Sequence, residues 1–170
     1  MKFKTFLAGC LGGLLSLNSC TNSPDMTDYT AYVNPFIGTG GHGHTFPGAI
    51  VPHGMISPSP DTRIDGWDAC SGYYYADSTI NGFSHTHLSG TGCCDYGDVL
   101  LMPTVGEQKY LPTGSQSQQM AYASAFSHQN ETAEPGYYSV FLDTYQVKAE
   151  LTASKRAAIH RYTFPESKEA

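Results

Sequence analysis

Two His-x-His pairs are the residues of this sequence whose types and spacing most directly suggest chemistry. His42 and His44 lie in the stretch GTGGHGHTFPG, and His85 and His87 lie in FSHTHLSG. On an extended backbone, both side chains of such a pair point to the same face. Imidazole nitrogens from two pairs could then bind zinc or another transition metal.

The same histidines have a simpler interpretation as polar contacts within glycine-rich loops. No Glu follows either pair at close range, and the nearest carboxylates, Asp95 and Asp98, lie in the turn-like stretch CCDYGD. In that setting the imidazoles would bond to backbone carbonyls or to the hydroxyls of a bound sugar. We favour these contacts over a metal site and assign no metal ligand from the sequence.

A second group of candidate residues surrounds the single tryptophan. The stretch SPDTRIDGWDACSGYYY places Trp67 between Asp65 and Asp68 and ahead of three tyrosines. An aromatic ring can stack on the apolar face of a sugar while carboxylates accept hydrogen bonds from its hydroxyls. A buried core tryptophan is the alternative, but Gly-Trp-Asp lacks strand alternation, so we favour a carbohydrate site. A catalytic Asp65/Asp68 pair has little support, since most loop pairs could span the roughly 6.5–9.5 Å of an inverting glycosidase.

Several other functions are disfavoured by motif and charge. The GTGG run lacks the Lys-Ser/Thr and helix of a phosphate-binding loop, and no Gly-x-Ser-x-Gly elbow occurs. The formal net charge is −6 and only 14% of residues are charged, with no Lys/Arg cluster. Nucleic acid is therefore an improbable partner, and a neutral substrate fits better.

The elements that must position these residues are loops and short strands. Residues 32–66 are too rich in Pro and Gly for a helix. Short apolar runs predict strands at Ala49–Val51, at Met55–Ile56, in SGYYYAD and in DVLLMP. The polar stretch 107–133 predicts a hairpin or a long loop that leaves the sheet.

Three alternating runs near the C-terminus give the clearest structural prediction. They are GYYSVFLDTY, QVKAELTAS and KRAAIHRYTF. In the second run, Val147, Ala149 and Leu151 share one face, and Lys148 and Glu150 share the other. This pattern predicts an antiparallel meander in a β-sandwich whose last strand is an unpaired edge. The predicted fold class is all-β, with an incomplete β-sandwich.

The first 31 residues predict export. Lys2 and Lys4 precede an apolar run that ends at Leu17-Asn18-Ser19-Cys20, the pattern of a signal peptide over 1–19 followed by a lipidated Cys20. A plain signal peptide or short membrane anchor is the alternative. Residues 20–31 then form a tether, and the domain occupies 32–170. An exported Cys70 could form a disulfide with Cys93 or Cys94, or all three could be buried thiols.

Taken together, the motifs resemble the N-terminal domain of glycoside hydrolase family 92, from about Tyr32 to Pro165. The stretches that carry the resemblance are YVNPFIGTGGHGHTFPGA, GWDACSGYYY, FSHTHLSGTG, DYGDVLLMP and the C-terminal run from FSHQNETAEPGYYSVFL onward. The family contains exo-acting α-mannosidases, common as secreted lipoproteins of gut Bacteroidetes. The resemblance implies a β-sandwich followed by an (α/α)₆ barrel. It also implies calcium-dependent hydrolysis with inversion, by a Glu acid and an Asp base in the barrel.

By position in the matching motifs, the resemblance implies a substrate-binding role but no catalytic residue for this stretch. The candidates that line or support the mannose subsite are Trp67, Asp68, Cys70, His85 and His87, with His42 and His44 as weaker candidates. The calcium ligands are expected mostly outside the chain. Ala69 and Tyr74 depart from the aromatic residue and the His that relatives often carry there, which leaves the preferred linkage open.

Three hypotheses follow. The first is the N-terminal part of an α-1,2-mannosidase-like enzyme that acts on mannose-containing N-glycans or mannans, inactive without its barrel. The second is a lipid-anchored, non-catalytic glycan-binding module, and the third is a structural envelope lipoprotein. In each, the protein is expected at the outer membrane, on its periplasmic or surface side, held by lipid alone, or else free in the periplasm or medium.

Overall fold

The fold was analysed in a computed structural model, which describes residues 27–63, 66–92, 94, 96–109 and 120–168. The predicted signal peptide, the lipidation site at Cys20 and most of the tether lie outside the described residues. The same holds for Asp65, Cys93 and Asp95. Within the described ranges, no helix has the length and apolar character needed to cross a membrane.

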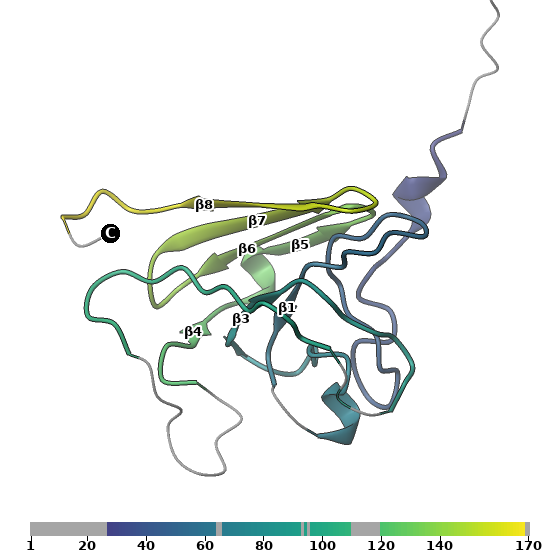
Figure 1. The fold of residues 1–170 in the computed structure, drawn as a ribbon, viewed down its shortest axis with the longest axis horizontal. Coiled ribbons are helices and arrows are strands. Elements are labelled where there is room, and N and C mark those ends of the chain that lie inside the picture. Colours follow the sequence, from purple (N-terminus) through teal and green to yellow (C-terminus); the bar gives the residue numbers. More distant parts are fainter. Residues whose placement is uncertain (1–26, 64–65, 93, 95, 110–119, 169–170) are drawn as a thin grey trace, which may run out of the picture.

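A four-stranded antiparallel sheet forms one layer of the molecule (Figure 1). Its strands follow the sequence in order: β5 (Glu131–Glu134), β6 (Tyr137–Leu142), β7 (Val147–Ala153) and β8 (Ala158–Thr163). The three alternating runs are β6, β7 and β8, so the predicted meander is confirmed. No other described strand pairs with the outer side of β8, which confirms the predicted edge.

Alternation along the strands decides which face of this sheet is buried. Val147, Ala149 and Leu151 of β7 are at most 1% exposed, as predicted. Their partners across the ladder are buried too, with Val140 opposite Ala149 and Tyr138 opposite Leu151. Each large apolar side chain removed from water in this way contributes about 1.5–3 kcal/mol. The sheet therefore owes its register to one continuous apolar face.

On the opposite face of the sheet, Glu150 is buried as well. Arg161 of β8 lies directly across the ladder and donates to the Glu150 carboxylate from Nε (2.7 Å) and Nη2 (2.6 Å). The Tyr137 hydroxyl donates to it at 2.7 Å. These donors, Arg161 first, lower the pKa of Glu150 to about 2.

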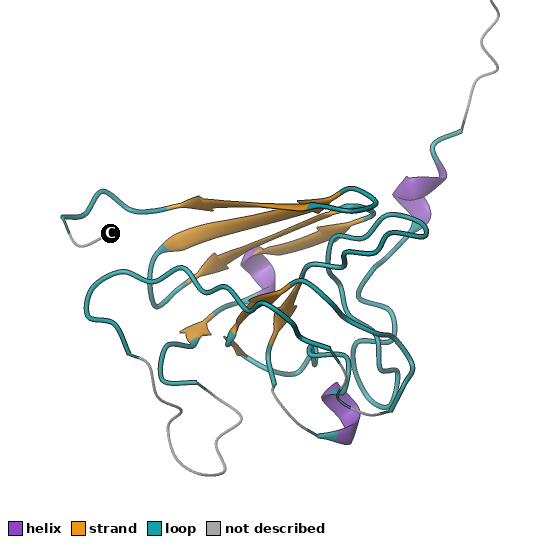
Figure 2. Ribbon diagram, in the orientation of Figure 1, coloured by secondary structure: helices purple, strands orange, loops and turns teal. Residues whose placement is uncertain are grey.

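The second half of the molecule is a set of loops with short strands and three 3₁₀ turns (Figure 2). Strand β1 (Ser59–Asp61) pairs with β3 (Gly82–Ser84), and β2 (Thr79–Ile80) pairs with β4 (Ser124–Ala125). The turns are η1 (Tyr29–Tyr32), η2 (Trp67–Ala69) and η3 (His128–Asn130). With the sheet, these elements confirm the all-β class.

Four predicted strands in this half are wrong. Ala49–Val51, Met55–Ile56 and SGYYYAD form no strand, and DVLLMP contributes only a bridge between Leu101 and Phe83. Their backbone groups bond to distant loops instead, for example the Ala49 N–H to the Pro58 carbonyl and the Tyr75 N–H to the Thr39 carbonyl. The prolines and glycines around these runs prevent a regular ladder.

A buried carboxylate fastens the loops to the sheet. Glu131 of β5 accepts hydrogen bonds from the hydroxyls of Tyr138 (2.6 Å) and Tyr73 (3.1 Å). His128 Nδ1 lies 2.6 Å from the same carboxylate, while His128 Nε2 donates to the Tyr75 carbonyl. Burial, then the nearby Glu131 charge, raises the pKa of both tyrosine hydroxyls. The segment 73–75 is thus held against β5 and β6.

Candidate functional site

The turn η2 presents Trp67 and Asp68 at the surface. Trp67 is 62% exposed, which fits a surface binding site and not a buried core position. One edge of the indole lies against the backbone at Gly92, and the His44 ring meets it edge-on at 4.8 Å between centroids. The remaining aromatic surface is open to solvent and to a ligand.

The His42/His44 loop closes on η2 from the other side. His42 Nδ1 lies 2.5 Å from Asp68 Oδ1. His44 is 7% exposed, and its Nε2 is buried with no hydrogen-bond partner among the described residues. The Gly90 N–H donates to the His44 carbonyl at 2.7 Å. This contact joins the loop to the stretch that follows His87, so three motifs far apart in sequence meet around Trp67.

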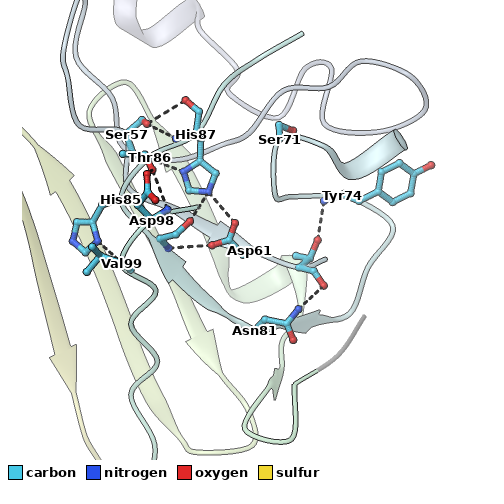
Figure 3. Close-up of polar contacts among 12 residues, drawn as sticks. Ser57, Asp61, Ser71, Tyr74, Asn81, His85, Thr86, His87, Asp98 and Val99 are labelled. Carbon is cyan, nitrogen blue, oxygen red and sulfur yellow. Dashed lines mark hydrogen bonds and ion pairs between the residues drawn. The ribbon is translucent and has the colours of Figure 1, made fainter. Parts of the chain in front are cut away.

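His87 sits in a buried polar network beneath this surface (Figure 3). Its Nδ1 donates to the Ser57 carbonyl at 2.7 Å, and its Nε2 lies 2.9 Å from Asp61 Oδ1 and 3.0 Å from Ser84 Oγ. The second Asp61 oxygen accepts the Ser84 N–H. Because Ser84 and Asp61 share one ring nitrogen, this is no nucleophilic triad, in which the base bridges nucleophile and acid. His87 instead ties Ser57, Asp61 and Ser84 together.

His85 faces a different part of the molecule. It donates from Nδ1 to the Val99 carbonyl at 2.8 Å and stacks on His160 of β8 at 4.6 Å (Figure 3 shows the Val99 contact). Burial, followed by the nearby His85, lowers the pKa of His160 to about 4. His85 and His87 therefore do not present one metal-binding face, and the loop-contact interpretation holds for both.

Cys70 closes η2 and is buried as a free thiol. The Cys94 Sγ donates to the Gly66 carbonyl at 3.6 Å, and no disulfide joins these two described cysteines. Both cysteines line a cavity of about 170 Å³ together with Asp61, His87 and Tyr96. Cys70 supports the turn from inside, whereas Trp67 and Asp68 form its outer surface.

Two residues of the charged stretch around Trp67 have structural roles that the sequence did not assign. Asp61 orients His87, and Arg63 holds the loop that follows η2. Arg63 makes a bidentate ion pair with Asp77 (2.7–3.1 Å) and lies over the Tyr74 ring at 4.4 Å. The Asp77 hydrogen bonds raise the pKa of Arg63. Tyr74 thus serves as a platform for Arg63.

An all-β domain that surrounds an exposed tryptophan with a carboxylate and histidines has the character of a carbohydrate-active protein. The chain belongs to glycosyl hydrolase family 92. The model of that family's N-terminal domain matches residues 32–170.

Solved structures and one curated relative support the assignment to this family. The family GH92 α-mannosidase BT3965 from Bacteroides thetaiotaomicron, solved in complex with mannoimidazole, is 50% identical with a TM-score of 0.76 over 81% of this chain and 18% of its own. The inverting mannosidase BT2199 of the same organism is 35% identical, with a TM-score of 0.68. The match covers 85% of this chain and 19% of the BT2199 chain. A secreted glycosidase of Arthroderma benhamiae is 32% identical over 81% of this chain. The chain spans about 18% of that relative's length.

The expected calcium ion has no suitable ligand set among the described residues. Their one cluster of three or more His, Cys, Asp or Glu side chains is His42, His44 and Asp68. Calcium takes six to eight oxygen ligands, whereas this cluster offers two nitrogens and one carboxylate. These residues therefore do not fit calcium.

Proposed function

We propose that this chain is the sugar-positioning domain of an exported α-mannosidase of family 92. The observation that carries the proposal is the meeting of three separate motifs around the exposed Trp67, in a chain that belongs to this family. The substrate class is a mannose-terminated glycan, such as an N-glycan or a mannan.

In this role Trp67 stacks on the apolar face of a mannose unit, and Asp68 and His42 bond to its hydroxyls. His87, Asp61 and Cys70 hold η2 and its surroundings so that this surface is preformed. Positioning of this kind lowers the entropy cost of the reaction. Inverting hydrolysis further needs an acid and a base roughly 6.5–9.5 Å apart. We assign both groups, and the calcium requirement, to the (α/α)₆ barrel expected beyond this domain.

A lipid-anchored glycan-binding module is the second candidate. The exposed Trp67 and its carboxylate neighbour favour it, because they form a sugar-binding surface without any contribution from another domain. In either case we propose export with Cys20 as the lipid-bearing residue. Loss of membrane association in a Cys20→Ser variant tests that anchor.

The deciding experiment measures mannose release from α-linked mannobiose. The chain is assayed alone and after fusion to the C-terminal region of BT3965, each with calcium and with chelator. We expect turnover only in the fusion, at least tenfold lower in its Trp67→Ala variant. A Tyr29→Ala fusion is the control, since Tyr29 is an exposed aromatic outside the site.

Two outcomes would contradict the enzyme proposal. Turnover by the chain alone would place the acid and base within it. A fusion that folds but releases no mannose, together with saturable mannobiose binding by the chain, would establish the binding module instead.

A further inference from the structure

The cluster of His42, His44 and Asp68 has the composition of a transition-metal site. One potential ligand atom from each residue lies within 4.8 Å of the other two, and this is the one such cluster among the described residues. We propose that these three side chains bind a divalent transition metal ion, and that Zn²⁺ suits them best. Zinc sites are commonly built from imidazole nitrogens and carboxylate oxygens.

The site would form by movements of about 1.5 Å or less, since the three ligand atoms lie within 4.8 Å of one another. Ligand atoms about 2.0–2.2 Å from a tetrahedral zinc lie about 3.3 Å from one another. His42 Nδ1 and Asp68 Oδ1 are 2.5 Å apart, so they would separate by less than about 1 Å. The His42 side chain is 80% exposed and that of Asp68 is 37% exposed. Both can therefore adjust without disturbing the core.

His44 supplies the fixed ligand. It is 7% exposed, and its buried Nε2 has no partner among the described residues. A polar atom kept from water without a hydrogen bond costs free energy, which coordination of this imidazole to a metal would offset. The ring is held by its edge-on contact with Trp67 at 4.8 Å, and the backbone by the Gly90 N–H. One buried ligand residue and two exposed ones thus lie within 4.8 Å of one another.

The ligand types also select the ion. Two imidazoles and one carboxylate suit zinc, copper or nickel, whereas calcium and magnesium prefer oxygen ligands throughout. Three protein ligands leave a fourth position for water or another group. A metal ion held here would engage the His42 and Asp68 side chains that the proposed function gives to mannose hydroxyls, so zinc and the sugar would compete for them. The two proposals are still tested separately, because metal binding is measured without any substrate.

The test uses Co²⁺ as a spectroscopic probe on the untagged protein after chelator treatment. Bound cobalt gives visible absorption bands that report its coordination. We expect these bands to saturate at one equivalent, to disappear when Zn²⁺ is added, and to persist in excess Ca²⁺. His42→Ala and Asp68→Asn should each weaken Co²⁺ binding at least tenfold.

His53→Ala is the matched control, since His53 is an exposed histidine outside the cluster. It should leave the bands unchanged, and circular dichroism should show that all variants fold. Three results would overturn the proposal: no saturable band, a band that survives both ligand substitutions, or an equal loss in His53→Ala. These measurements contain no sugar and the mannose-release assay contains no cobalt, so failure of the metal site is distinguishable from failure of the proposed function.

Discussion

At the scale of single residues, the site depends on a close approach between Trp67 and a glycine. A Cβ atom on Gly92 would lie 2.6 Å from the Trp67 ring, and Gly92 has a φ of +72°. Gly92→Ala should therefore displace the indole as well as strain the backbone. Trp67 is the single tryptophan of the chain, so its fluorescence reports the displacement. We expect a shifted emission maximum and weaker sugar binding in this variant.

Gly90→Ala is the control for that change. Gly90 has a φ of +73°, but a Cβ there meets nothing within 4 Å. Both substitutions should cost about 1 kcal/mol of stability from the left-handed backbone. Only Gly92→Ala should alter the emission spectrum. The same spectral shift in both variants would mean that backbone strain, not contact, moves the indole.

The buried pair of Asp61 and His87 is a second residue-scale determinant. The side chain of His87 is 2% exposed and that of Asp61 is 11% exposed. Asp61→Ala leaves His87 Nε2 and the Ser84 N–H without their carboxylate partner, and removal of one member of such a pair costs about 3 kcal/mol. Urea denaturation should show this loss. Asp98→Ala, which breaks an exposed contact with Thr86, should cost less than about 1 kcal/mol.

At the scale of elements, the sequence predicted β6, β7 and β8 because each carries its own alternation. It could not predict β1 to β4, whose pairings depend on loops that meet only in the folded chain. The burial of Glu150 cannot be read from alternation either, because it follows from Arg161 on the next strand. For the site, the local sequence Gly-Trp-Asp did predict the exposure of Trp67, because it lacks strand alternation. The contact of Asp68 with His42, which is 26 residues away, depends on how two loops pack.

The β7–β8 ladder should give the protein a two-stage loss of stability in acid. The lowered pKa of His160, about 4, means that the folded state resists its protonation, so stability falls as the pH drops from about 6.5 to 4. Glu150 has a lowered pKa of about 2, so its contribution is present above about 4.5 and is lost as the pH falls toward 2. Thermal melts across this range should show both stages.

Substitutions separate the two stages. His160→Phe should remove the pH dependence between 6.5 and 4, and Glu150→Gln should remove the one below 4.5. His53→Phe is the control, because His53 is an exposed histidine. If His160→Phe keeps the full dependence above pH 4, the titration belongs to another histidine.

At the scale of the whole molecule, the open edge at β8 is the feature most exposed to other chains. Its unpaired N–H and C=O groups can template association, and apolar side chains on the edge strengthen this tendency. Ile159 is 65% exposed and Phe164 is 42% exposed. We expect the isolated chain to self-associate in a concentration-dependent way, which light scattering measures.

Ile159→Gln should reduce that association without lowering the melting temperature, since the side chain already faces solvent. Thr163→Gln is the matched control, because Thr163 is an exposed polar residue on the same face of β8. It should associate like the parent chain, as it removes no apolar surface. Equal association by all three proteins would shift the cause from the edge strand to the exposed loop residues around Trp67.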